Sequence, residues 1–216
     1  MAELREGIYG YYSGSPYTKS ESLTKDEMRL NATYIYKSLG IYGGWTMNAI
    51  CSILGNMQAE STINPGRWQS DKVGSTSNGY GLVQWTPSTK YTGWCSSNGF
   101  SDPSEMDANL SRIVYEVENG LQWIPTDSYP LTFEEFTKSH ESIEYLAKAF
   151  LLCYERPADK SASVQNYRSQ LAYAWHTYFE TGSLPDLPDT PTVTRKKRKY
   201  NFLILNANKR RRAWIR

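Results

Sequence analysis

One glutamate, Glu60, stands near the end of a predicted amphipathic helix, where its carboxyl group could serve as an acid. The apolar residues Ile50, Ile53 and Met57 recur at spacings of three and four, and Glu60 continues the same face. Apolar surroundings and the negative end of the helix dipole both disfavour a charged carboxylate, so they favour a protonated side chain. A protonated glutamic acid can give its proton to a poor leaving group such as a glycosidic oxygen. The alternative is a structural glutamate that caps Ser61 or pairs with an arginine.

A glycine-rich segment with aromatic neighbours follows Glu60 along the chain. Residues 78–85 read Asn-Gly-Tyr-Gly-Leu-Val-Gln-Trp, and their two glycines would let the backbone approach a ligand closely. Gln84 offers both a donor and an acceptor, as the hydroxyl and amide groups of a sugar require. The rings of Tyr80, Trp85 and Trp68 have apolar faces and polar edges that could hold pyranose rings. The alternative is that these rings pack a small sheet.

The second acid that glycosidic cleavage would use is not fixed by the sequence. Asp71 is the only acid between Glu60 and Asp102, so it is the candidate base. Glu155 could reach the same cleft and contact a substrate there, although a structural contact with Arg156 or the backbone is the alternative. If neither serves, Glu60 would act first as acid and then as base.

The elements that must position these groups are mostly helices. Thr24 and Glu27 form a capping-box pattern before a helix that should run to about residue 39, and Thr46 can cap the helix that carries Glu60. Residues 68–101 lack helical periodicity, so loops and a small irregular sheet are expected there, with 81–85 as its clearest strand. Further helices are expected from a cap at Asp102–Glu105, after Thr132, over 142–154 and over 161–181. The prediction is an α+β fold, mainly helical, with a cleft beside the sheet.

Composition restricts the class of protein further. Aromatic residues make up 14% of 216 residues, too many for a disordered chain, and no apolar run approaches the length of a membrane span. The N-terminus shows no secretory signal pattern. The three cysteines form no CxxC pair and only two histidines accompany them, so buried thiols are expected, with no metal site and no cofactor.

The C-terminal segment differs sharply in charge from the rest of the chain. Residues 1–189 hold 14 basic and 22 acidic residues, whereas ten of the 24 basic residues lie in the last 22 positions. The predicted organisation is an arm at 1–23, a catalytic domain at 24–182, a proline-rich linker at 183–194 and a basic docking tail at 195–216. The tail residues expected to contact a partner are Arg195, Lys196, Lys197, Arg198, Lys199, Arg210, Arg211 and Arg212. An acidic protein is the favoured partner; nucleic acid is less favoured because no readable nucleic-acid motif accompanies the charge.

Several motifs together resemble a known family. The run Ile53-Leu-Gly-Asn-Met-Gln-Ala-Glu-Ser-Thr-Ile-Asn-Pro-Gly66, then Gly79-Tyr-Gly-Leu-Val-Gln-Trp85 and Tyr154-Glu-Arg-Pro157, is similar to phage tail lysozymes, which stand near goose-type lysozymes and soluble lytic transglycosylases. The resemblance covers about residues 24–180. It implies a lysozyme-like fold, with Glu60 as general acid and Gln84 in the sugar-binding cleft.

The resemblance also implies a substrate and a setting. The substrate would be peptidoglycan, cleaved between N-acetylmuramic acid and N-acetylglucosamine, and the protein would work in the virion at the tail tip, beside other tail proteins. Relatives often carry a second peptidase domain, but the tail of this chain lacks the His/Asp set that such a domain needs. The competing class is an inactive structural plug or glycan-binding module with a lysozyme fold, and a free lysis enzyme is less favoured.

Overall fold

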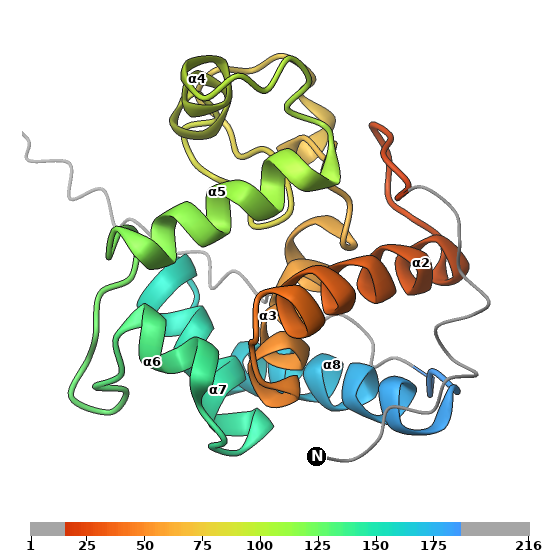
Figure 1. Cartoon of the computed structure of the whole chain (residues 1–216), viewed down its shortest axis with the longest axis vertical. Coiled ribbons are helices and arrows are strands. Elements are labelled where there is room, and N and C mark those ends of the chain that lie inside the picture. Colours follow the sequence, from red (N-terminus) through yellow and green to blue (C-terminus); the bar gives the residue numbers. More distant parts are fainter. Residues whose placement is uncertain (1–15, 187–216) are drawn as a thin grey trace, which may run out of the picture.

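The structure is a computed structural model and describes residues 16–186. Helices dominate this part of the chain (Figure 1). They are α2 (Lys25–Tyr36), α3 (Met47–Ser61), α4 (Thr89–Ser97), α5 (Met106–Glu118), α6 (Phe133–Lys138), α7 (Ile143–Ala149) and α8 (Ala162–Thr181). Two π-helices, η1 (Lys37–Tyr42) and η3 (Phe150–Glu155), continue α2 and α7, and a short 3₁₀ turn, η2 (Gln69–Asp71), lies between α3 and α4.

Helix α3 is the centre of the packing. It contacts α2, α6, α7, η3 and α8, and its residues from Ala49 to Gln58 are all buried. In Figure 1, α4 and α5 lie towards one end of the molecule and α6, α7 and α8 towards the other, with α3 between them. The sequence motif that begins at Ile53 therefore lies in the helix that most other elements contact. The last turn of this helix is only partly buried.

Most predicted helix ends are confirmed. The side chains of Thr24 and Thr132 each accept a hydrogen bond from the backbone N–H of a glutamate three residues later. The side chain of that glutamate accepts one in return from the backbone N–H of the threonine, and Thr46 caps α3. Gly182 ends α8 with a φ of 79°, which glycine adopts without steric cost. The predicted helix over 142–154 is present, with its second half wound as the π-helix η3.

The prediction of a small sheet is wrong. Within residues 16–186 the structure contains only isolated bridges, Trp68 with Tyr80, Tyr80 with Trp85 and Thr126 with Tyr129, and the expected strand 81–85 is a series of turns. Gly81 and Gln84 both have positive φ, which is incompatible with an extended strand. The mainly helical class is confirmed, but the β component of the α+β prediction is not.

Two further expectations for this region are also corrected. Residues 89–97 form helix α4, although no helical periodicity had indicated it. The cap predicted at Asp102 is displaced: α5 begins at Met106, and Asp102 instead accepts a bond of 2.8 Å from the backbone N–H of Ser104. A local Asx turn competes with the helix for that side chain.

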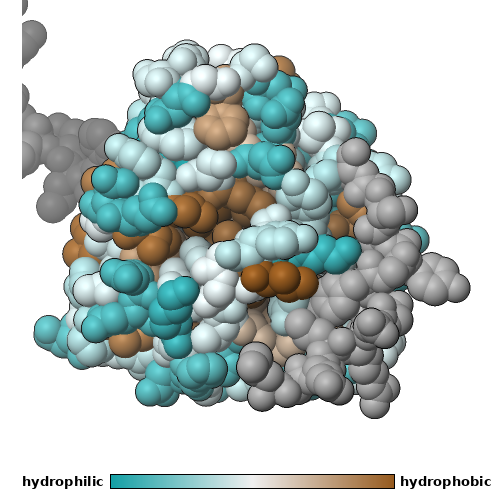
Figure 2. Space-filling view, in the orientation of Figure 1, coloured by the Kyte–Doolittle hydropathy of each residue, from teal (hydrophilic) through white to brown (hydrophobic). Residues whose placement is uncertain are grey.

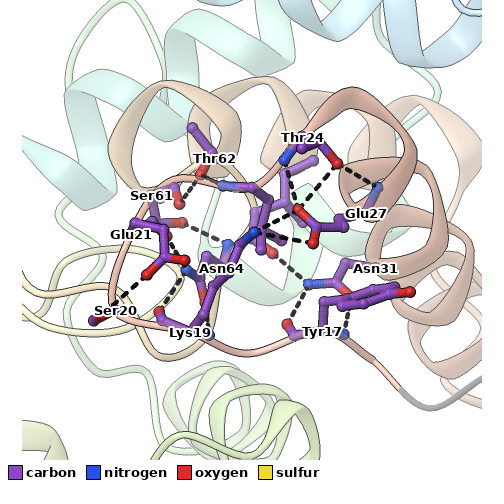
Figure 3. A network of polar contacts seen from close by, with 12 residues as sticks. Tyr17, Lys19, Ser20, Glu21, Thr24, Glu27, Asn31, Ser61, Thr62 and Asn64 are labelled. Atoms are coloured by element: carbon purple, nitrogen blue, oxygen red, sulfur yellow. Dashed lines mark hydrogen bonds and ion pairs between the residues drawn. The ribbon is translucent and has the colours of Figure 1, made fainter.

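The segment before α2 is bonded to the rest of the domain (Figure 3). The amide of Asn31 donates to Tyr17 O and to Ile63 O, each at 2.8 Å, and that of Asn64 donates to Lys19 O and Glu21 O, each at 2.7 Å. Residues 17–23 therefore hold the turn that follows α3, and with it the end of the helix that carries Glu60.

The exposed face drawn in Figure 2 is mostly polar, with apolar side chains gathered in a hollow near its centre. Among residues 16–186, no helix combines the length and apolarity that crossing a bilayer requires. The three cysteines, Cys51, Cys95 and Cys153, are free and buried, as the sequence predicts.

Candidate active site

A cavity of about 550 Å³ opens where α3, the glycine-rich segment and η3 meet. This volume lies in the usual range for small-ligand sites. The lining residues include Glu60, Trp68, Gln84, Trp85 and Glu155, all of which the sequence predicts as site residues. Its rim also carries the basic side chains Arg67, Lys90 and Arg156.

The carboxyl group of Glu60 lies at the C-terminal end of α3, as predicted. Its side chain is 24% exposed, and Arg168 of α8 donates a hydrogen bond from Nη2 to Glu60 Oε1. The sequence left open whether Glu60 pairs with an arginine or serves as an acid. The structure contains the arginine pair and also places Glu60 in the cavity lining.

The carboxyl group of Glu155 also belongs to the cavity. Its side chain is 5% exposed, and its oxygen Oε2 lies 3.5 Å from Arg168 Nη2. The alternative contact with Arg156 is not formed. Arg156 Nη1 donates instead to Gln122 O and Cys153 O, at 2.5 Å and 2.6 Å.

Burial raises the pKa of Glu155 well above the usual range for a carboxyl group. The Arg168 guanidinium opposes this increase, and the neighbouring carboxylate of Glu60 adds to it. A carboxyl group in such surroundings is favoured in its neutral form.

Asp71 lies elsewhere. It is not in the lining of the cavity, its side chain is 74% exposed, and it pairs with Arg67 at 2.5 Å. Its loop is held in an unusual backbone conformation, since Ser70 and Asp71 both have positive φ. The predicted base is therefore paired at the surface.

Of the aromatic residues predicted as site residues, two line the cavity and one is buried. Trp68 and Trp85 line the cavity, whereas Tyr80 is buried between Trp68 and Tyr91. The centroid of the Tyr80 ring lies 4.1 Å from that of Trp68 and 6.0 Å from that of Tyr91. Gln84 lines the cavity, and its amide also donates to Arg67 O and Gly81 O. The sequence predicts Tyr80 as a sugar contact, but Tyr80 is buried and is not among the residues that line the cavity.

Short-range contacts connect the Glu60 helix to the glycine-rich segment. Ser61 Oγ lies 2.9 Å from Leu82 O, and the backbone N–H of Leu82 donates to Asn109 Oδ1 at 3.0 Å. A Cβ on Gly81 would come within 2.7 Å of that same Asn109 oxygen, so a glycine is required there. The segment is therefore fixed to α3 on one side and to α5 on the other.

Two residues that contact the cavity lining were not predicted from the sequence, Arg168 and Glu116. Arg168 lies on the buried face of α8, three residues before Leu171, and Glu116 lies on the buried face of α5, three residues after Ile113. A charged side chain on an apolar helix stripe is the signal that could have found both. Glu116 accepts from Trp85 Nε1 at 3.0 Å, from Arg112 Nε at 2.9 Å and from the hydroxyl of Tyr154.

Within residues 16–186, no group of three or more His, Cys, Asp or Glu side chains is arranged to hold a metal ion. The fold and site define the class of the protein as a small, mainly helical domain with two acidic side chains at one cavity. The sequence pattern of the family described as phage tail lysozyme matches residues 30–179, and the chain belongs to that family. This confirms the resemblance found in its motifs.

The chain is also similar to morphogenesis protein 1 of Bacillus phage B103. The two are 48% identical over 167 residues, which make up 77% of this chain and 44% of that protein. The chain therefore spans less than half the length of this relative.

Proposed function

We propose that the chain is a glycosidase that cleaves peptidoglycan between N-acetylmuramic acid and N-acetylglucosamine. It would be carried in the phage virion at the tail tip and open the host wall during genome entry, and its domain would have a lysozyme-like arrangement. The observation that carries the proposal is that Glu60 lines a cavity of about 550 Å³ beside a second acid, Glu155. Membership of the phage tail lysozyme family supports the substrate and the setting.

The proposed chemistry begins with proton transfer. Glu60 gives a proton to the glycosidic oxygen while the bond from that oxygen to the anomeric carbon breaks. Water, or the 6-hydroxyl of the muramic residue, forms the new bond and releases a proton to the carboxylates of the site. Trp68, Trp85 and Gln84 would contact the sugar rings. Glu155 is favoured over Asp71 as the second acid because Glu155 lines the cavity and Asp71 does not.

Turbidity loss of purified cell walls tests the activity. The unaltered chain should clear the walls, and Glu60→Gln should reduce the rate by about 100-fold or more, the usual contribution of a general acid. Glu141→Gln is the matched control, since Glu141 is exposed and lies outside the cavity lining. If the unaltered chain and the control both fail to clear the walls, the proposal is overturned. If Glu60→Gln clears them as fast as the unaltered chain, Glu60 is not the acid.

Mass analysis of the released muropeptides distinguishes the two nucleophiles. Attack by water yields reducing sugars, whereas attack by the muramic 6-hydroxyl yields an anhydro ring that is lighter by one water. The proposal of a glycosidase stands with either product, and the product identifies the reaction.

The alternative function is a structural plug or glycan-binding module that has lost activity. One observation favours it: a salt bridge to a buried arginine, such as Arg168 makes with Glu60, is also what a structural glutamate forms. Sedimentation of the chain with cell walls, without release of fragments, would identify this alternative.

We also propose that the basic tail, residues 195–216, docks onto an acidic surface of another tail protein. The tail lies outside the described residues, so its charge alone supports the proposal. Deleting residues 190–216 should prevent incorporation into particles while wall clearing is retained. Unchanged incorporation would overturn the docking proposal, and loss of DNA binding instead would identify nucleic acid as the partner.

A further inference from the structure

A single arginine stands between the two acids of the cavity. Arg168 is 6% exposed, its Nη1 donates to Asn56 O at 2.6 Å, and its Nη2 contacts both Glu60 and Glu155. The three side chains come from three different elements, α3, η3 and α8. Because one nitrogen contacts both carboxyl groups, these groups face the same point of the cavity wall.

The charges of this cluster do not balance if both acids are ionised. Two carboxylates and one guanidinium would leave one uncompensated negative charge, and Glu155 is almost fully buried. Neither oxygen of Glu155 accepts a hydrogen bond from a backbone N–H or a basic side chain among the described residues. A buried carboxylate without hydrogen bonds is costly, and a buried acid commonly avoids that cost by keeping its proton.

We propose that Glu60 and Glu155 hold one proton between them, that Arg168 positions both groups, and that this proton is the one Glu60 delivers to the glycosidic oxygen. The inference rests on the proposed function and deepens it. Glu155 would act through Glu60 as the store of the proton and would not contact the leaving oxygen. The proton moves from Glu155 to the Glu60 carboxylate, then to the sugar oxygen, and the proton released by the nucleophile restores the pair.

The surroundings of the pair agree with this role. Burial raises the pKa of Glu155, and the charge of Glu60 raises it further, while Arg168 lowers it. The other charged groups near the cavity are Arg156, which is directed to backbone carbonyls, and Arg67 and Lys90 on the rim. Arg67 is already paired with Asp71, so Arg168 is the cation that both acids share.

The dependence of wall clearing on pH tests the proposal through activity. Glu155→Gln keeps the shape of the side chain but cannot exchange a proton. It should lower the rate at neutral pH by about tenfold or more and change the shape of the pH profile, because the variant lacks the group that stores the proton. Glu141→Gln should leave the profile unchanged. A Glu155→Gln profile that matches the unaltered chain would overturn the proposal, as a purely structural role would leave the profile in place.

Carbon-13 NMR titration of the glutamate carboxyl groups in the full chain tests the same proposal without activity. One signal should titrate well above the ordinary glutamate range and be absent from Glu155→Gln. In Glu60→Gln that signal should titrate at lower pH, because a neighbouring negative charge has been removed. The shared proton is refuted if the Glu155 signal titrates in the ordinary glutamate range, or if its titration is the same in Glu60→Gln as in the unaltered chain. If the titrations agree but no variant clears walls, the shared proton stands and the proposed function fails.

Discussion

Two groups of buried or partly buried charged side chains flank the cavity. Glu155 has Arg168 and Glu60 as neighbours, and Glu116 has Arg112, with Tyr154 and Trp85 as further donors. Tyr154 precedes Glu155 in the chain, and Trp85 lines the cavity. The Glu116 group therefore holds two walls of the cavity from behind, at a point where the solvent does not reach.

The first prediction concerns this supporting group. Glu116→Gln removes the ion pair with Arg112 and leaves the partly buried Arg112 guanidinium without a countercharge, so the free energy of unfolding should fall by about 2–4 kcal/mol. Urea denaturation measures the change. Glu118→Gln, an exposed position on the same helix, should change stability by less than about 0.5 kcal/mol. Equal small effects at both positions would show that the buried group contributes little.

The second prediction concerns a single residue, Glu155, and the dependence of the free energy of unfolding on pH. Because burial raises the pKa of Glu155 above its ordinary value of 4.5, the folded state holds the proton more tightly than the unfolded chain does. The associated stability is complete below the ordinary pKa and is lost as the pH rises through the pKa of the folded state. Urea denaturation between about pH 5 and pH 8 should therefore show falling stability, and Glu155→Gln should flatten that slope. An identical slope in the variant would contradict the assignment to Glu155.

Among the elements, the contact between α3 and α8 brings the acid and the arginine together. Gly55 lies on α3 against the α8 backbone, where a Cβ would come within 2.6 Å of Ala172 N and 2.7 Å of Arg168 O. The absence of a side chain allows the two helices to approach closely. That approach places Arg168 beside Glu60, which lies about a turn and a half further along α3.

The third prediction follows from this close approach. Gly55→Ala should force the helices apart, lower the free energy of unfolding by about 1–3 kcal/mol and slow wall clearing as Arg168 moves away from the acids. Gly93→Ala is the matched control: Gly93 lies in α4 with open space around its Cα, so alanine should be neutral or stabilising by up to about 1 kcal/mol. If Gly55→Ala behaved like the control, the helix contact would not set the geometry of the site.

At the scale of the whole molecule, hydrogen bonds cross the boundary predicted between residues 23 and 24. Leu23 is buried, its backbone N–H donates to Thr62 Oγ1 at 2.9 Å, and the amide groups of Asn31 and Asn64 hold residues 17–21 (Figure 3). These contacts connect the start of the described chain to the turn after α3. We therefore propose that residues 17–23 belong to the same folded unit as α2 and α3.

The fourth prediction compares two truncations. A chain beginning at residue 24 should be less stable than one beginning at residue 16 by at least about 2 kcal/mol, from the burial of Leu23 alone. It should also clear walls more slowly, because the end of α3 loses its support. Thermal unfolding and the turbidity assay measure the two effects. Equal stability of the two chains would show that residues 17–23 do not belong to the folded domain.

The sequence by itself determined most of the helices, the caps at Thr24, Thr46 and Thr132, and the position of Glu60. Capping boxes, a terminal glycine and apolar spacing act over a few residues, so they can be recognised locally. It also predicted Trp68, Gln84, Trp85 and Glu155 as cleft residues from the chemistry of their side chains, and all four line the cavity. It misjudged the glycine-rich region, where positive φ angles and isolated bridges replace a sheet and residues 89–97 form a helix.

Only the tertiary structure decided the partner of each acid. Arg168 lies 108 residues from Glu60 in the chain, and no local pattern states which buried side chains will meet across two helices. The same packing left Asp71 at the surface and Tyr80 behind the cavity wall. Contacts between distant segments depend on how whole helices pack, and the close approach of α3 and α8 at Gly55 is the packing that brings Arg168 to Glu60.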